Sequence, residues 1–142
     1  MASRGHAVTI AAPAQSRILP EARRRGLDAV DLAIARKGVR GAMNMYRLLA
    51  HHAVDVVNTH SSTDSWLAAL ACAALGKAPT IVRTRHISAP VSKDPATRWL
   101  YVSATRRIVT TGETLRRRLI EDNGFPAERI TSVPTGIDSR RF

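Results

Sequence analysis

Short apolar segments alternate with helical segments along almost the whole chain. The apolar segments lie at residues 6–12, 30–34, 54–60, 80–86, 108–111 and 130–133. Helical patterns lie between them, at residues 20–25, 39–52, 61–76, 95–107 and 113–122. Strands that alternate with helices of about 10–15 residues indicate βαβ units and a parallel sheet. The sequence therefore predicts an α/β fold with a Rossmann-like, mostly parallel sheet and helices on both faces.

Length and charge narrow the class of protein. The chain has 142 residues, a formal net charge of +11 and 44% hydrophobic residues, which is too apolar for a disordered polycation. No run of eighteen apolar residues suggests a transmembrane helix, and the first residues do not resemble a signal peptide. A single cysteine, Cys72, provides neither an internal disulfide nor a zinc cluster. These features predict a soluble, basic, cytoplasmic domain.

The excess of positive charge predicts an anionic partner. Nucleic acid, a membrane surface and a phosphorylated or acidic small molecule all fit that description. The chain has only two Phe, two Tyr and two Trp, too few for a platform that stacks single-stranded bases. No groove-reading element is visible either, so we expect no specific nucleic-acid partner.

Two helix starts carry a capping-box pattern, in which a hydroxyl residue is followed three residues later by an acid. Ser61 with Asp64 is the first pair, and Thr110 with Glu113 is the second. Both pairs predict a helix that begins directly after a strand.

Polar residues follow several of the predicted strands. They are Asn58, Thr59, His60 and Ser61; Arg83, Arg85 and His86; Thr110, Thr111 and Gly112; and Gly136 and Asp138. Ligands of open parallel sheets bind outside the carboxyl ends of the strands. These residues are therefore the candidates for a binding or catalytic site.

His60 has the most informative position of the five histidines, because it ends a strand and precedes a helix. The positive end of a helix dipole favours neutral imidazole. Such a ring could accept a proton or hydrogen-bond a sugar hydroxyl. The same position is also compatible with a histidine that only fastens the turn between strand and helix.

Arg83 and Arg85 are two residues apart, so they lie on one face of their strand, whereas His86 lies on the other. Two guanidinium groups at a cleft would suit a phosphate or a carboxylate. The pattern also fits an edge strand whose arginines are solvated. Residues 23–25 and 116–118 are further arginine runs, which we interpret as solvated helix faces that could approach anionic lipid.

Five segments in order resemble the N-terminal, acceptor-side domain of the family 4 glycosyltransferases, which have the GT-B fold. The segments are residues 4–10, 55–61, 81–86, 109–115 and 129–138. The resemblance implies transfer of a sugar from a nucleotide-sugar donor to an acceptor, with retention at the anomeric carbon and without a metal ion or other cofactor. A bacterial enzyme of this kind would act at the inner face of the cytoplasmic membrane on a lipid-linked or other cell-envelope acceptor.

The resemblance also implies residue roles. His60 matches a histidine that lines the cleft and contacts the reacting sugars, and we expect it to be catalytic. The residues expected to bind substrate are Asn58, Ser61, Arg83, Arg85, His86, Thr111 and Gly112. Gly136 and Asp138 match the segment that leads to the donor-binding domain.

The chain departs from the family pattern at both ends. Family members place a strand, a glycine-rich loop and a helix before the segment that matches residues 4–10, and a donor-binding domain after the last match. We therefore expect residues 1–136 to form most of one domain and residues 137–142 to begin a linker. Without the first strand, the strands beside the gap must pair with each other or leave unpaired edges, so we expect a marginal or associating protein.

These departures leave two hypotheses for the function. The chain is either part of a glycosyltransferase with little turnover alone, or a non-catalytic module that binds an anionic glycan or assembles with a separate donor-binding chain.

Overall fold

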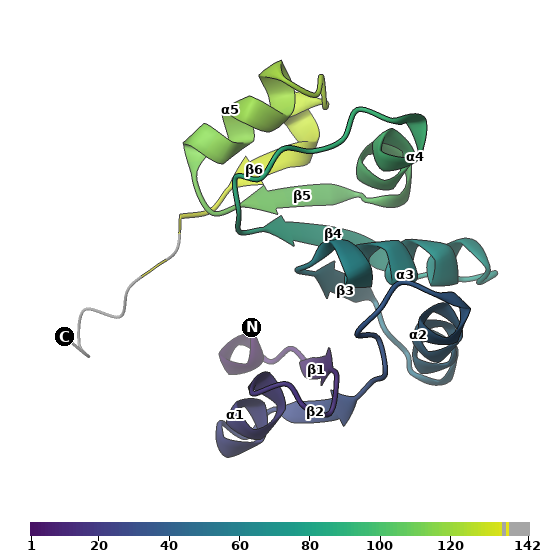
Figure 1. The fold of residues 1–142 in the computed structure, drawn as a ribbon. Coiled ribbons are helices and arrows are strands. Elements are labelled where there is room, and N and C mark those ends of the chain that lie inside the picture. Colours follow the sequence, from purple (N-terminus) through teal and green to yellow (C-terminus); the bar gives the residue numbers. More distant parts are fainter. Residues whose placement is uncertain (135, 137–142) are drawn as a thin grey trace.

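All strand pairs in the part of the chain described here are parallel, as the alternating pattern predicts (Figure 1). The computed structural model describes residues 1–134 and residue 136. One sheet pairs β1 (Thr9–Ala12) with β2 (Asp28–Asp31). The other has the order β3 (Val56–Thr59), β4 (Thr80–Arg85), β5 (Arg107–Thr110) and β6 (Ile130–Ser132).

Helices connect successive strands. They are α1 (Ile18–Arg24), α2 (Val39–His51), α3 (Ser62–Ala73), α4 (Pro95–Arg98), the π-helical turn η2 (Trp99–Ala104) that continues α4, and α5 (Glu113–Glu121). Two short 3₁₀ turns complete the description, η1 (Ala2–Arg4) and η3 (Ala127–Arg129). Helices flank the parallel strands, so the predicted Rossmann-like α/β fold is confirmed.

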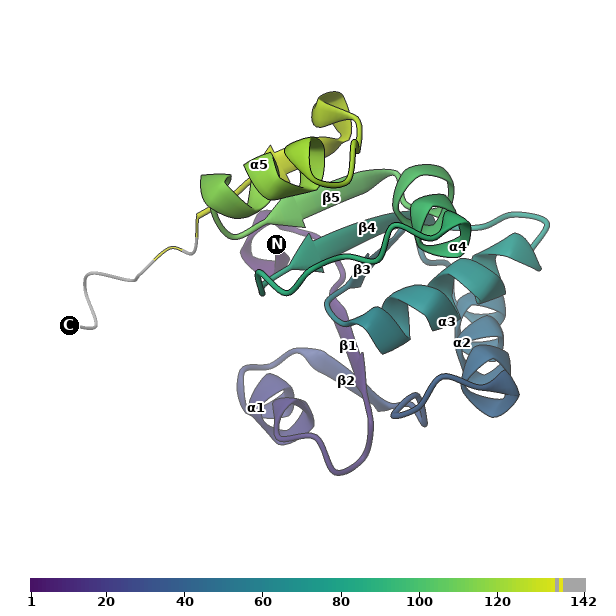
Figure 2. The ribbon, with the colours of Figure 1, turned by 45° about the horizontal axis from the view of Figure 1, so that its top comes forward.

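The order of the four-stranded sheet decides which face its helices cover. Each strand from β3 to β6 pairs with the next in sequence, and parallel crossovers are right-handed, so α3, α4 and α5 lie on one face (Figure 2). On that side α3 packs on β3 and β4, α5 packs on β5 and β6, and α2 packs against α3. None of the helices in residues 1–134 is long and apolar enough to cross a membrane.

The buried core lies between the four-stranded sheet and these helices. It comprises Leu32, Ile34, Met45, Leu49, Leu67, Ala68, Ala69, Ala71, Ile81, Leu100, Tyr101, Ile108, Leu119, Phe125 and Ile130. Alternate residues of β4, including Ile81 and Arg83, point into it, because side chains alternate across a strand. The core therefore packs directly against the sheet whose strand ends carry the candidate residues.

An unpaired gap separates the two sheets. Among the described residues β1 pairs only with β2, and β3 only with β4, and Figure 1 shows β1 and β2 set apart below β3. The carbonyl of Asp55 accepts the Thr80 amide at 2.9 Å, so alternate residues of β3 direct their backbone groups to β4. Val56 and Asn58 consequently direct theirs to the unpaired edge, where Val56 is 52% exposed. Of the two outcomes predicted for the gap, the structure shows unpaired edges.

Several predicted element boundaries are wrong; the first strand begins at Thr9 rather than residue 6, and α3 ends at Ala73 rather than residue 76. The second strand occupies Asp28–Asp31 rather than residues 30–34, because its four residues pair with Thr9–Ala12 of β1. The helix predicted to reach residue 107 ends at Ala104 instead. The Arg106 amide donates to the carbonyl of Ile81 at 2.8 Å, which draws this segment into the sheet.

One of the two predicted capping boxes is confirmed. Asp64 accepts an amide hydrogen bond from Ser61, whose hydroxyl in turn accepts from the Asp64 amide. The capping box predicted for Thr110 and Glu113 is wrong, because α5 begins after Gly112 without a side-chain cap. The hydroxyl of Thr110 is completely buried and donates to the carbonyl of Gly112 at 3.1 Å.

Candidate functional site

The start of α3 fixes the position of His60. The Asp64 carboxylate accepts hydrogen bonds from two successive backbone amides, those of His60 at 3.0 Å and Ser61 at 2.8 Å. The turn between β3 and α3 is therefore fastened through the backbone and not through the imidazole ring. That ring is left free for other contacts.

The imidazole rings of His60 and His86 are joined. His60 Nδ1 lies 2.9 Å from His86 Nε2, a hydrogen bond in which either ring can be the donor. The rings stack with centroids 5.2 Å apart and an interplanar angle of 15°. Both residues are exposed, and they follow neighbouring strands, so the predicted meeting of strand ends takes place here. In either tautomer His60 Nε2 remains available to a ligand.

The surroundings favour the neutral form of His60. Although the residue is exposed as a whole, partial burial of its ring lowers the pKa from the ordinary value of 6.5, and His86 lowers the pKa further. Asp64 acts in the opposite direction but more weakly. A folded-state pKa below the unfolded value means that the unfolded chain binds the proton first. The contribution of neutral His60 to the free energy of unfolding is therefore fully present above pH 6.5 and is lost as the pH falls below that value.

The shift in the pKa of His60 gives a titration prediction. His86→Ala is expected to raise the pKa of His60 by removing a neighbouring charge, yet to leave it below 6.5, because burial is the larger cause. The measurement is an NMR titration of the His60 Cε1 proton. His52→Ala, at the C-terminal end of α2, is the matched control and should leave that titration unchanged. A wild-type His60 that titrates at or above 6.5 would contradict this description of the site.

A second polar pair lies on the same strands. The Thr84 hydroxyl donates to Asn58 Oδ1 at 2.9 Å. This bond links β3 to β4, and each of its two residues precedes one of the paired histidines by two positions. Asn58 is exposed and Thr84 is half-buried. The Asn58 amide nitrogen is directed away from this contact and can still donate to a ligand.

Arg83 and Arg85 lie on the opposite face of β4 and are almost completely buried, with 5% and 9% of their surface exposed. Arg85 donates through Nη1 to the Tyr101 hydroxyl at 2.9 Å and through Nη2 to the carbonyl of Ala89. The guanidinium of Arg83 lies over the Tyr101 ring, 4.5 Å from its centroid. The alternative of an edge strand with solvated arginines is therefore wrong, because β4 lies between β3 and β5.

The remaining predicted residues are farther along the same edge. Thr111 and Gly112 follow β5 and are half-buried, with no side-chain hydrogen bond to the histidine pair. Gly136 follows β6 and is exposed. Asp138 lies outside the described residues, as do residues 137–142 of the predicted linker.

Two residues that contact the candidate site residues were not predicted from the sequence. Tyr101, from η2, contacts both arginines, but a tyrosine in a helical segment carries no signal for a partner some 16 residues earlier. Thr84 was detectable in principle, because it alternates with His86 on the same face of β4. Residues 1–134 bring together no group of three metal-ligating side chains of the His, Cys, Asp or Glu types.

The parallel sheets and their flanking helices define a Rossmann-like α/β protein, a fold whose ligands bind outside the carboxyl ends of the strands. Comparison with known families identifies it further. The chain belongs to the family described as Glycosyltransferase Family 4, whose model matches residues 1–141.

The structure is also similar to the crystal structure of a glycosyltransferase from Rickettsia africae ESF-5, with a TM-score of 0.75 and 16% sequence identity. The similarity covers 96% of this chain and 36% of that one, so this chain spans little more than a third of that protein. A comparison with curated protein sequences found no match. At this level of identity the likeness supports the fold, and the family supports the class of protein.

Proposed function

We propose that this chain is the acceptor-side half of a retaining glycosyltransferase. The complete enzyme transfers a sugar from a nucleotide-sugar donor to a lipid-linked or other cell-envelope acceptor. The observation that carries the proposal is the hydrogen-bonded pair of His60 and His86 at the carboxyl ends of β3 and β4, in a chain of glycosyltransferase family 4. This edge of a parallel sheet is where ligands bind.

The proposed role of His60 follows from its environment. With Nδ1 engaged by His86, only Nε2 faces a ligand, and the lowered pKa keeps the ring neutral near pH 7. A neutral ring hydrogen-bonds a sugar hydroxyl as donor or acceptor, depending on the tautomer that His86 selects. His60 therefore positions the reacting sugar, and Asn58 and Ser61 contact the acceptor beside it.

The donor side belongs to a second domain in this proposal. A nucleotide-sugar then needs a donor-binding domain, which joins through the segment containing Gly136 and Asp138 or assembles as a separate chain. Because this chain spans 36% of the similar glycosyltransferase, we expect little turnover from it alone. The reaction as proposed uses no metal ion and no further cofactor.

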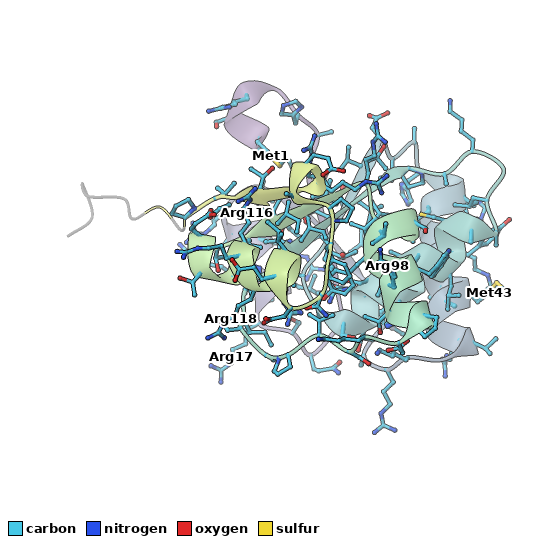
Figure 3. All side chains as sticks on the ribbon, turned by 90° about the horizontal axis from the view of Figure 1, so that it is seen from above. Met1, Arg17, Met43, Arg98, Arg116 and Arg118 are labelled. Carbon is cyan, nitrogen blue, oxygen red and sulfur yellow. The ribbon has the colours of Figure 1, made fainter. Side chains whose placement is uncertain are left out.

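Basic helix faces support a location at an anionic membrane surface. Arg24 and Arg25 lie exposed on or just after α1, and Figure 3 shows Arg116 and Arg118 on α5. Part of this charge is neutralised, since Glu21 pairs with Arg24 and Arg25 and Glu113 pairs with Arg116. Each remaining cation near anionic lipid contributes roughly 1 kcal/mol. We propose peripheral binding to the inner face of the cytoplasmic membrane.

A binding experiment tests the acceptor assignment. Oligosaccharides released from a bacterial cell envelope are expected to shift the NMR signals of His60 and His86 in the full chain. His60→Ala should weaken this binding about ten-fold, since one or two hydrogen bonds are lost. The control His52→Ala should bind as the wild type does. Tighter binding of uridine diphosphate glucose than of the oligosaccharides at these histidines would contradict the proposal.

The alternative of a non-catalytic acceptor module differs from the proposal in the result expected of a sugar-transfer assay. Both functions predict glycan binding, but only the catalytic function predicts transfer once a donor-binding domain is supplied. Co-purification of a second Rossmann-like chain that restores transfer favours assembly.

A further inference from the structure

Arg83 and Arg85 are two buried cations without a visible counter-charge. Their residues are 5% and 9% exposed. The ion pairs in the described part of the chain all lie elsewhere and involve Glu21 and Glu113, each with arginines close by in sequence. Buried charges in proteins are normally paired, because removing an ion from water is costly. This pair therefore requires an explanation.

Their hydrogen bonds are also incomplete. Three buried nitrogens, Arg83 Nε, Arg83 Nη1 and Arg85 Nε, have no hydrogen-bond partner in the structure as described. Tyr101 supplies its ring face to Arg83 and its hydroxyl to Arg85, which neutralises no charge. Buried donors without partners are rare, and an absent ion or ligand is one of their recognised causes.

The nearest acid does not compensate for this charge. Burial is the largest cause and lowers the pKa of Arg83; Tyr101 raises it, Arg85 lowers it, and Asp64, the smallest of the four causes, raises it. The Asp64 carboxylate already accepts the amides of His60 and Ser61. A net positive charge thus remains beneath the strand ends that carry the histidine pair.

We propose that Arg83 and Arg85 hold a phosphate group of a substrate, on the face of β4 opposite the histidine pair. A phosphate carries up to two negative charges and offers three or more oxygens, which matches two guanidinium forks better than a carboxylate with one charge. The exposed residues 86–90 border Arg85 through Ala89, so the phosphate reaches the arginines from that side. The inference deepens the proposed function and rests on it, since it assigns a phosphorylated substrate to the same edge.

The competing explanation is that Tyr101 alone accommodates the two arginines as structural residues. Under that explanation, phosphate stabilises the wild type and Arg83→Met equally, through its general exclusion from protein surfaces. The two explanations therefore differ in a measurement made without a glycan or an activity assay.

The test is thermal unfolding of the full chain in rising concentrations of inorganic phosphate and pyrophosphate, with sodium chloride at matched ionic strength. The wild type is expected to gain stability with phosphate and not with chloride. Arg83→Met, which removes the charge but keeps the volume, is expected to weaken the apparent affinity about ten-fold or more. Arg117→Met, an exposed residue of α5 with the same charge change, is the matched control and should respond like the wild type.

Two further arms complete the design. Glycerol phosphate and uridine diphosphate distinguish an acceptor phosphate from the diphosphate of a donor, and tighter binding of either supports the site. Phosphorus-31 NMR line broadening of phosphate with the wild type gives the affinity even if Arg83→Met does not fold. Equal effects of phosphate and chloride, or an unchanged response in Arg83→Met, would overturn the proposal. Glycan binding at His60 and His86 is measured separately, so loss of the phosphate proposal would leave the proposed function unchanged.

Discussion

The variant Val56→Pro is expected to stay folded and to lose the concentration-dependent association that we expect of the wild-type chain. Val56 directs its backbone N–H to the unpaired edge of β3, so proline there removes no hydrogen bond of the β3–β4 ladder. Unpaired strand edges are templates for pairing with another copy. Loss of one edge donor should raise the dissociation constant about ten-fold.

Val57→Pro is the matched control, one residue farther along the same strand. Val57 directs its backbone groups to β4, and proline there leaves a ladder acceptor without its donor. We expect this variant to lose about 1–3 kcal/mol of unfolding free energy, enough to unfold a marginal domain. The contrast separates the unpaired edge from the strand itself.

Sedimentation velocity over a range of concentrations measures the association, and urea unfolding measures the stability. Val56→Lys, which places a charge at the same edge, should also reduce association and covers the case in which the proline variant does not fold. A wild-type chain that remains monomeric and unfolds in one sharp, reversible transition would refute the prediction.

The second large effect is expected at His60. In a complex that contains a donor-binding domain, His60→Ala should lower the rate of sugar transfer by about 10²–10³-fold, the range for losing one hydrogen bond to the reacting group. His86→Ala should have a smaller effect, because it removes the partner of Nδ1 but leaves the Nε2 that faces the ligand.

The pH profile distinguishes positioning from a purely structural role. If His86 fixes the tautomer of His60, His86→Ala should move the acid limb of the rate profile to higher pH, in the direction of the raised pKa of His60. His52→Ala should alter neither the rate nor the profile. Full activity in His60→Ala would remove this residue from the mechanism.

Much of the fold was predictable because strand and helix periodicities are local properties of the sequence. The order of strands and helices, the parallel pairing and the capping box of Ser61 and Asp64 all depend on near neighbours. The boundaries that failed were decided by distant partners. The bounds of β2 follow its pairing with β1, and Ile81 draws Arg106 into the sheet.

The site could be predicted only in part for the same reason. The strand-end rule brought His60 and His86 to one edge, but only the folded chain shows that the rings are hydrogen-bonded. The burial of Arg83 depends on Tyr101 and on the central position of β4, neither of which follows from the alternation of arginines. Local sequence gave no reason to choose between solvated and buried arginines.

The most direct test of the central claim is transfer of a radiolabelled sugar from a nucleotide-sugar to a bacterial cell-envelope fraction. The wild-type chain, a family 4 donor-binding domain and the two together are assayed side by side. We predict labelled glycan only from the two together, with little or none from either alone. Comparable transfer by the 142-residue chain alone, or no transfer from an assembled complex, would contradict its assignment as the acceptor-side half of a glycosyltransferase.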